Sequence, residues 1–135
     1  MKSLVLVLAI ALISAGLKPL KSYSVCESIG TFVTTSFTGT PSILCTLYPV
    51  TWEGIFSARY CPSTISISET LNSTSTYTNL VDLGGTTCYQ TGDFKAFNFS
   101  IDPFRCLPGN YYIQIYLQST TEPKISCLDY TFSIA

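Results

Sequence analysis

Histidine is absent from this chain, and its absence limits the chemistry that the other residues can perform. Without histidine the chain lacks the usual general base at neutral pH, and with it Ser-His-Asp and Cys-His nucleophilic systems. No motif pairs two carboxylates for glycoside chemistry, and Asp82–Gly85 lacks the lysine of a phosphate loop. We interpret every acid as a solvated surface or turn residue: Glu27, Glu53, Glu69, Asp82, Asp93, Asp102, Glu122 and Asp129. The sequence predicts neither enzymatic activity nor a cofactor.

Cysteine is the other residue type with reactive potential, and the chain has six: Cys26, Cys45, Cys61, Cys88, Cys106 and Cys127. None of these pairs has the close spacing of a zinc site, so no metal is expected. An even count in a secreted chain favours three disulfides, with many connectivities open. A Cys26–Cys127 bridge would close nearly the whole domain, a constraint of roughly 4 to 5 kcal/mol. Proximity along the chain then suggests Cys45–Cys61 and Cys88–Cys106.

The N-terminal segment explains why the cysteines are read as disulfides. A basic start is followed by the apolar run Leu4–Ile13 and the small residues Ser14–Gly16. The run is about half the roughly 20 residues of a membrane-spanning helix, which is typical of a signal peptide. We expect residues 1–16 to be that peptide and residues 17–135 to form one domain, secreted or in the lumen of the secretory or endolysosomal pathway.

Charge is sparse, with 7 basic and 8 acidic residues and a net charge of −1. No basic patch is present, so a nucleic-acid partner is not expected. Two glycosylation sequons, at Asn72 and Asn98, predict a glycoprotein. The first lies in the polar stretch Leu71–Thr78, which we expect to be an exposed loop. The second requires Asn98 to face solvent from an expected strand.

The sequence predicts that the secondary-structure elements carrying these residues are β-strands. Apolar and polar residues alternate in several segments, which is typical of half-buried antiparallel strands. The clearest are Thr64–Ser68, Phe97–Ile101, Tyr112–Gln118 and Ser126–Ile134. Two less regular segments, Tyr23–Phe37 and Tyr48–Tyr60, are rich in β-forming residues. With turn signals between them, the segments predict an all-β fold of seven to eight short strands, a sandwich or a barrel.

The second half of the chain carries a family resemblance. Its residues are Val81–Phe94, Phe97–Pro103, Leu107–Ile113 and Lys124–Leu128. This pattern resembles the C-terminal half of the ML lipid-recognition family, which includes the ganglioside activator, a lysosomal cholesterol carrier and fungal phosphatidylinositol/phosphatidylglycerol transfer proteins. The family typically bridges its first and last cysteines. The resemblance implies an immunoglobulin-like β-sandwich of two antiparallel sheets, stapled by disulfides.

The resemblance also implies a function, secreted non-enzymatic lipid binding or lipid transfer, with a lipid or sterol held between the sheets. The residues expected to line the cavity are Ile65, Ile67, Phe97, Phe99, Ile101, Ile113, Ile115, Leu117 and Phe132. An amphipathic rim that contacts membranes transiently would consist of Trp52, Phe56 and Tyr60. Alternation fits a close-packed core equally well, and the three aromatic residues fit core packing. We expect the protein to be a monomer.

Two other functions stay open at this point. The chain fits an immunoglobulin-like adhesion or recognition module with a solid core and a Tyr/Thr-rich surface. It also fits a small secreted effector or inhibitor whose loop between Cys45 and Cys61 binds a protein. A cavity of several hundred Å³ between the sheets would favour lipid binding.

Overall fold

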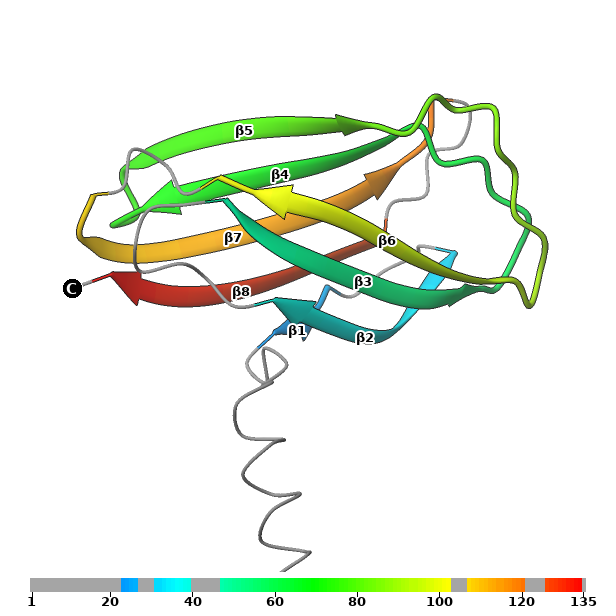
Figure 1. Cartoon of the computed structure of the whole chain (residues 1–135), viewed down its shortest axis with the longest axis horizontal. Coiled ribbons are helices and arrows are strands. Elements are labelled where there is room, and N and C mark those ends of the chain that lie inside the picture. The colour runs from blue at the N-terminus through cyan, green and yellow to red at the C-terminus, as the bar shows by residue number, and fades with distance from the viewer. Residues whose placement is uncertain (1–22, 27–30, 40–46, 103–106, 121–125, 135) are drawn as a thin grey trace, which may run out of the picture.

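The computed structural model describes residues 23–26, 31–39, 47–102, 107–120 and 126–134, and these ranges form two antiparallel β-sheets without a helix (Figure 1). A five-stranded sheet has the order β1-β8-β7-β4-β5, and a three-stranded sheet the order β2-β3-β6. The strands are β1 (Ser24–Val25), β2 (Phe32–Gly39), β3 (Tyr48–Phe56), β4 (Thr64–Leu71), β5 (Ser75–Asp82), β6 (Phe94–Ile101), β7 (Gly109–Gln118) and β8 (Ser126–Ile134). The predicted all-β architecture of seven to eight strands is confirmed. Within the same ranges, no helix has the length and apolar character needed to cross a membrane.

Alternation along the strands builds the inner face of the five-stranded sheet. Successive side chains of a strand point to opposite faces, so every second residue meets the core. In β7, Ile113, Ile115 and Leu117 are fully buried, while the residues between them lie on the outer face. In register with them, β4 contributes Ile65 and Ile67. The observed bounds of β8 match the predicted Ser126–Ile134 segment.

Aromatic side chains dominate the inner face of the three-stranded sheet. The Phe32 ring meets Trp52 at 5.4 Å, Phe56 at 4.9 Å and Phe97 at 5.4 Å between centroids. Gly54 makes room for this packing, because a Cβ there would lie 2.6 Å from the Phe32 ring. Edge and tilted ring contacts of this kind add about 0.5 to 1.5 kcal/mol each beyond their buried area.

Polar contacts also join the two sheets through the core. The hydroxyls of Tyr48 in β3 and Tyr130 in β8 share a hydrogen bond of 2.8 Å. The backbone N–H of Phe32 donates to the Ser126 hydroxyl at 3.0 Å, again between the sheets. Both contacts are buried, so each fixes the position of one sheet relative to the other.

Glu69 departs from the expectation that every acid is solvated. It continues the inward series of β4 and is 2% exposed. In register, Glu69 pairs with Ile113, which pairs with Tyr130, so its side chain shares the inner face with that tyrosine, and a negative charge there contributes to raising the pKa of both Tyr48 and Tyr130. The period of two, rather than the charge of the side chain, decides which face it joins.

Strand β5 was not predicted. The segment Leu71–Thr78 was expected to be a loop, yet only residues 72–74 form the turn and Ser75 begins β5. From Thr76 to Leu80 every residue is exposed, because β5 is an edge strand that the narrower sheet does not cover. A strand exposed on both faces carries no apolar alternation, which explains why the pattern failed there.

The buried tyrosine pair predicts a loss of stability in alkali. Burial is the largest cause that raises the pKa of Tyr48 and Tyr130 above their ordinary value of 10.0. The unfolded chain therefore releases these protons near pH 10 while the folded chain keeps them, and the free energy of unfolding falls as pH rises beyond about 10. The slope is up to about 1.4 kcal/mol per pH unit for each tyrosine. Urea denaturation between pH 8 and 11.5 measures it.

A double variant, Tyr48→Phe with Tyr130→Phe, tests the assignment. It should lose stability more slowly above pH 10 than the wild type does. Tyr116→Phe, on the outer face of β7, is the matched control and should keep the wild-type slope. Equal slopes in the double variant and the wild type would contradict the assignment.

Candidate functional site

A groove at the edge of the sandwich is the best candidate for a ligand site. It lies along β6, the edge strand of the smaller sheet, and against the segment that follows β5. Its volume is about 390 Å³, and it is open to solvent. The lining residues are Pro62, Leu83, Thr87, Tyr89, Lys95, Ala96, Phe97 and Asn98. The volume lies in the range of small-molecule sites, near its lower end.

Phe97 connects this edge groove to the core. The residue is only 5% exposed, and its ring packs against Phe32 inside the sandwich. On the groove side the ring lies 6.4 Å from that of Tyr89, in edge-to-face orientation. A ligand in the edge groove would therefore touch an aromatic side chain that is continuous with the hydrophobic core.

Lys95 gives the edge groove its positive charge. Its Nζ lies 6.0 Å from the centroid of Tyr89 and 5.7 Å from that of Phe97. These are cation–π distances, and such contacts hold the ammonium over the ring faces. Lys95 is the one charged residue among the described residues that line the groove.

A disulfide, Cys61–Cys88, fixes one wall of the edge groove. Tyr60 and Tyr89 pair as an isolated antiparallel bridge, with backbone hydrogen bonds of 3.0 and 2.8 Å. This bridge places the adjacent cysteines side by side, 4.1 Å apart at Cα. Pro62, a lining residue, follows directly after the first cysteine.

The expected pairs Cys45–Cys61 and Cys88–Cys106 were wrong. Cys61 and Cys88 bond to each other, because strand pairing rather than closeness in sequence brings them together. Cys45 and Cys106 lie outside the described residues. The Cys26–Cys127 bond is confirmed and ties β1 to β8 across 101 positions.

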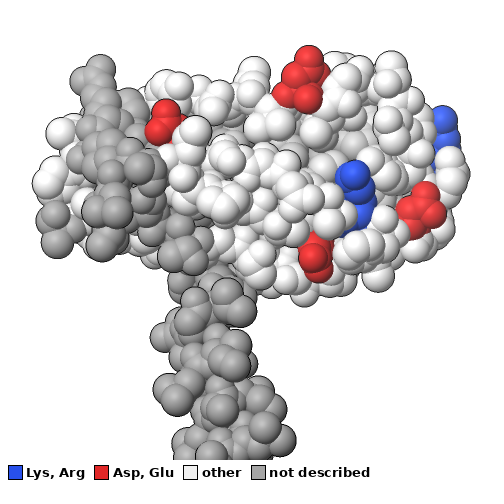
Figure 2. Space-filling model, in the orientation of Figure 1, with Lys and Arg blue, Asp and Glu red and all other residues white. Residues whose placement is uncertain are grey.

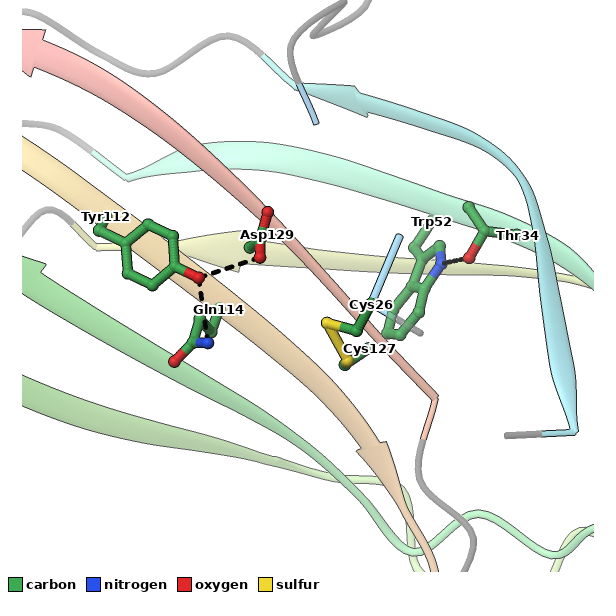
Figure 3. The surroundings of a disulfide bond; sticks show 7 residues. All are labelled: Cys26, Thr34, Trp52, Tyr112, Gln114, Cys127 and Asp129. Atoms are coloured by element: carbon green, nitrogen blue, oxygen red, sulfur yellow. Dashed lines mark hydrogen bonds between the residues drawn. A yellow bond between two sulfur atoms is a disulfide. The ribbon is translucent and has the colours of Figure 1, made fainter. Parts of the chain in front are cut away.

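Figure 3 shows the surroundings of that second disulfide. The indole Nε1 of Trp52 donates to the Thr34 hydroxyl at 2.9 Å, so the buried ring has its polar atom satisfied. On the outer face of the larger sheet, Tyr112 donates to Asp129 at 2.9 Å and accepts from Gln114. Desolvation raises the pKa of Tyr112, and the hydrogen bond to Asp129 adds to the effect.

The nine residues predicted to line a cavity all lie on the inner faces of the two sheets. Seven are buried, at most 5% exposed, whereas Phe99 and Phe132 are partly buried and pack against the core. Phe97 alone of the nine lines the edge groove. Phe132 lines a second groove, also of about 390 Å³, at the other end of the larger sheet. The structure thus gathers the nine around one core, with Phe97 at its open edge.

The predicted rim residues need correction. Trp52, Phe56 and Tyr60 are 0%, 0% and 1% exposed, so they do not form an exposed rim. The rings of Phe56 and Tyr60 stack with centroids 6.3 Å apart, and Phe56 also stacks on Tyr89 at 4.6 Å. Core packing, the alternative interpretation of these aromatic residues, describes their positions.

Several residues of the edge groove were not singled out from the sequence. Lys95 shares the inward register of β6 with Phe97, so extending the alternation backwards by two residues would have placed it there. No sequence pattern marked Tyr89, Thr87 and Pro62 as groove residues. The Cys61–Cys88 disulfide and the Tyr60–Tyr89 bridge position them, and neither contact can be predicted from local sequence.

Both sequon asparagines are exposed. Asn72 begins the β4–β5 turn with φ 50°, and its Oδ1 accepts from the Asn110 backbone at 2.9 Å. Asn98 lies on β6, where its Oδ1 accepts from the Thr51 hydroxyl at 2.7 Å. Glycosylation at either position stays a prediction. Among the residues that the structure describes, no three His, Cys, Asp or Glu side chains gather to hold a metal ion.

Comparison with known proteins places this fold beside two solved structures. No protein-family model and no curated protein matches the chain. Chicken MD-1, crystallised in complex with lipid IVa, aligns with a TM-score of 0.55 at 14% identity, over 83% of this chain and 87% of that chain. The C-terminal domain of wzt aligns with a TM-score of 0.59 at 12% identity, over 89% and 81%. At these identities the similarity establishes a shared fold.

The wall disulfide can be tested by removing it. Cys61→Ser with Cys88→Ser should lower the free energy of unfolding by about 3.5 kcal/mol, because the bond closes a loop of 27 residues. Urea denaturation measures the loss, and Cys26–Cys127 should still be found by peptide mapping. A wild-type map that joins Cys61 to Cys45 would contradict the assignment.

Proposed function

We propose that this protein binds a lipid, and that the apolar part of the ligand enters the sandwich at the edge groove. The observation that carries the proposal is the position of Phe97, which lines the groove on one side and packs in the core on the other. An acyl tail that lies along the Phe97 ring moves from water to an apolar surface. This transfer contributes about 0.8 kcal/mol of binding free energy for each buried methylene.

Two further observations support lipid binding. The inner faces of both sheets are built mainly from aliphatic and aromatic side chains, and the polar groups among them include Glu69, Ser126 and the hydroxyls of Tyr48 and Tyr130. MD-1, which shares this fold, has been crystallised with lipid IVa. Transfer of this binding to the present chain is part of the proposal, as is the choice between a lipid and a sterol.

The remaining features of the proposed function concern setting and activity. We propose that the protein is secreted or resides in the lumen of the secretory pathway, since its disulfides Cys26–Cys127 and Cys61–Cys88 are stable in an oxidising compartment. We also propose that it acts without catalysis and as a monomer. Its glycans would then lie at the exposed Asn72 and Asn98.

A recognition module with a solid core is the alternative, and one observation favours it. Phe32, Phe37, Trp52 and Phe56 are at most 2% exposed and pack in mutual or cross-sheet ring contacts. Close packing of this kind is the usual state of a protein interior. Under this alternative the protein would carry no lipid.

Native mass spectrometry of the secreted, deglycosylated protein distinguishes the two functions. Lipid binding predicts co-purifying lipid at near one-to-one stoichiometry, which organic extraction then identifies. Thr87→Trp should lower the bound fraction severalfold, because Thr87 is an exposed wall residue and an indole there fills part of the groove. An apo mass that stays unchanged after incubation with mixed lipid vesicles would contradict lipid binding.

A matched control separates blockage from a general effect of added aromatic surface. Thr78→Trp makes the same change at an exposed position of β5, outside the edge groove. This variant should retain the wild-type bound fraction. An equal loss in both variants would show that the edge groove is not the entrance.

A further inference from the structure

The outer face of the smaller sheet carries three large apolar side chains exposed to solvent. Val33 in β2 is 54% exposed, Ile55 in β3 41% and Phe94 in β6 59%. Val33 pairs with Ile55 in register, and Ile55 pairs with Phe94, so the three form one row across all three strands. We call these residues the apolar row. Contiguous exposed apolar side chains of this size commonly mark an interaction site.

We propose that the apolar row docks this protein on the surface of a lipid bilayer, beside the entrance through which the ligand passes. The inference deepens the proposed lipid-binding function and rests on it. Its first support is continuity along β6: Phe94 belongs to the row, while Lys95 and Ala96, the next two residues, line the edge groove. A bilayer in contact with the row would therefore lie next to the groove.

The size of the apolar row favours a bilayer over a second copy of the chain. A stable protein interface needs roughly 20 to 30 residues from each partner. On the same face, Glu53 pairs with Ala96 beside the row, and Thr51 pairs with Asn98 beyond them, so large apolar side chains do not continue along β3 or β6. Three side chains are too few for a specific dimer. A bilayer interface needs no such area, since lipid surrounds each inserted side chain separately.

Charge around the apolar row favours an uncharged membrane surface. Glu53 lies next to Ile55 on the same face, and Asp93 directly precedes Phe94 in the chain. Arg59 follows β3 in the chain, and Lys95 holds its ammonium over the rings of Tyr89 and Phe97 in the edge groove, so within the described residues the row offers no cluster of basic side chains to anionic lipids. On the face drawn in Figure 2, a few red and blue groups stand on a largely uncharged surface. Docking should therefore depend on apolar insertion rather than on salt.

Flotation with phosphatidylcholine vesicles tests the proposal. The wild type should float with the vesicles, and the double variant Ile55→Thr with Phe94→Ser should partition at least about tenfold more weakly, because two exposed apolar side chains no longer insert. Adding phosphatidylserine or 0.5 M salt should change wild-type binding little. The control is Leu80→Ser, since Leu80 is 61% exposed on β5 and lies away from the row. Equal flotation of wild type and double variant would overturn the proposal.

Two further readouts separate this inference from its alternatives. Occupancy by lysophosphatidylcholine below its micelle concentration, read by native mass spectrometry, reports on the lipid site alone and should be the same in the double variant. A wild type that binds no lysophosphatidylcholine would refute the proposed function. A wild type and a double variant that bind this lipid equally and also float equally would refute only the docking face. Sedimentation velocity should find monomers. A wild type that forms dimers, together with a double variant that stays monomeric, would overturn bilayer docking in favour of self-association.

Discussion

The unequal width of the two sheets is the constraint on which the rest of this structure depends. Five strands form one layer and only three the other, so the smaller sheet covers part of the apolar face opposite it. Strand β5 is left exposed, and β6 becomes an edge beside which the chain must pass. The groove exists because the segment from Leu83 to Tyr89 crosses this uncovered edge without closing it.

Fixed contacts inside the sandwich limit how a ligand can enter. The Tyr48–Tyr130 hydrogen bond and the Phe37–Tyr130 ring contact at 5.5 Å join the smaller sheet to β8, on the side of the larger sheet opposite to β5. Cys26–Cys127 secures β1 to β8 on that same side of the larger sheet. Separating the sheets there would cost both the packing and the buried hydrogen bond. Phe97 stands at the opposite edge, where fewer of these contacts would have to break.

How far the sequence determines this structure differs between its elements. The bounds of β8 follow from alternation, because one of its faces is buried along its length. Strand β5 is exposed on both faces from Thr76 to Leu80, so no period marks that stretch. The Cys61–Cys88 bond depends on the pairing of Tyr60 with Tyr89, and such a contact in space leaves no local signal. The same limit applies to the groove: the inward position of Lys95 follows from the register of β6, whereas its approach to Tyr89 does not.

Strand β6 links the three features that matter for function. Its inward residues Lys95 and Phe97 face the groove and the core, while Phe94 lies on the outer face of the sheet. A period of two therefore places the exposed Phe94 of the proposed docking face and the aromatic Phe97 of the proposed ligand site three residues apart on one short strand. The Cys61–Cys88 disulfide fixes one wall of the groove, and neither cysteine belongs to the apolar row. In the groove, the ammonium of Lys95 lies 5.7 Å from the centroid of Phe97, so a cation and the aromatic edge of the core meet at one place on this strand.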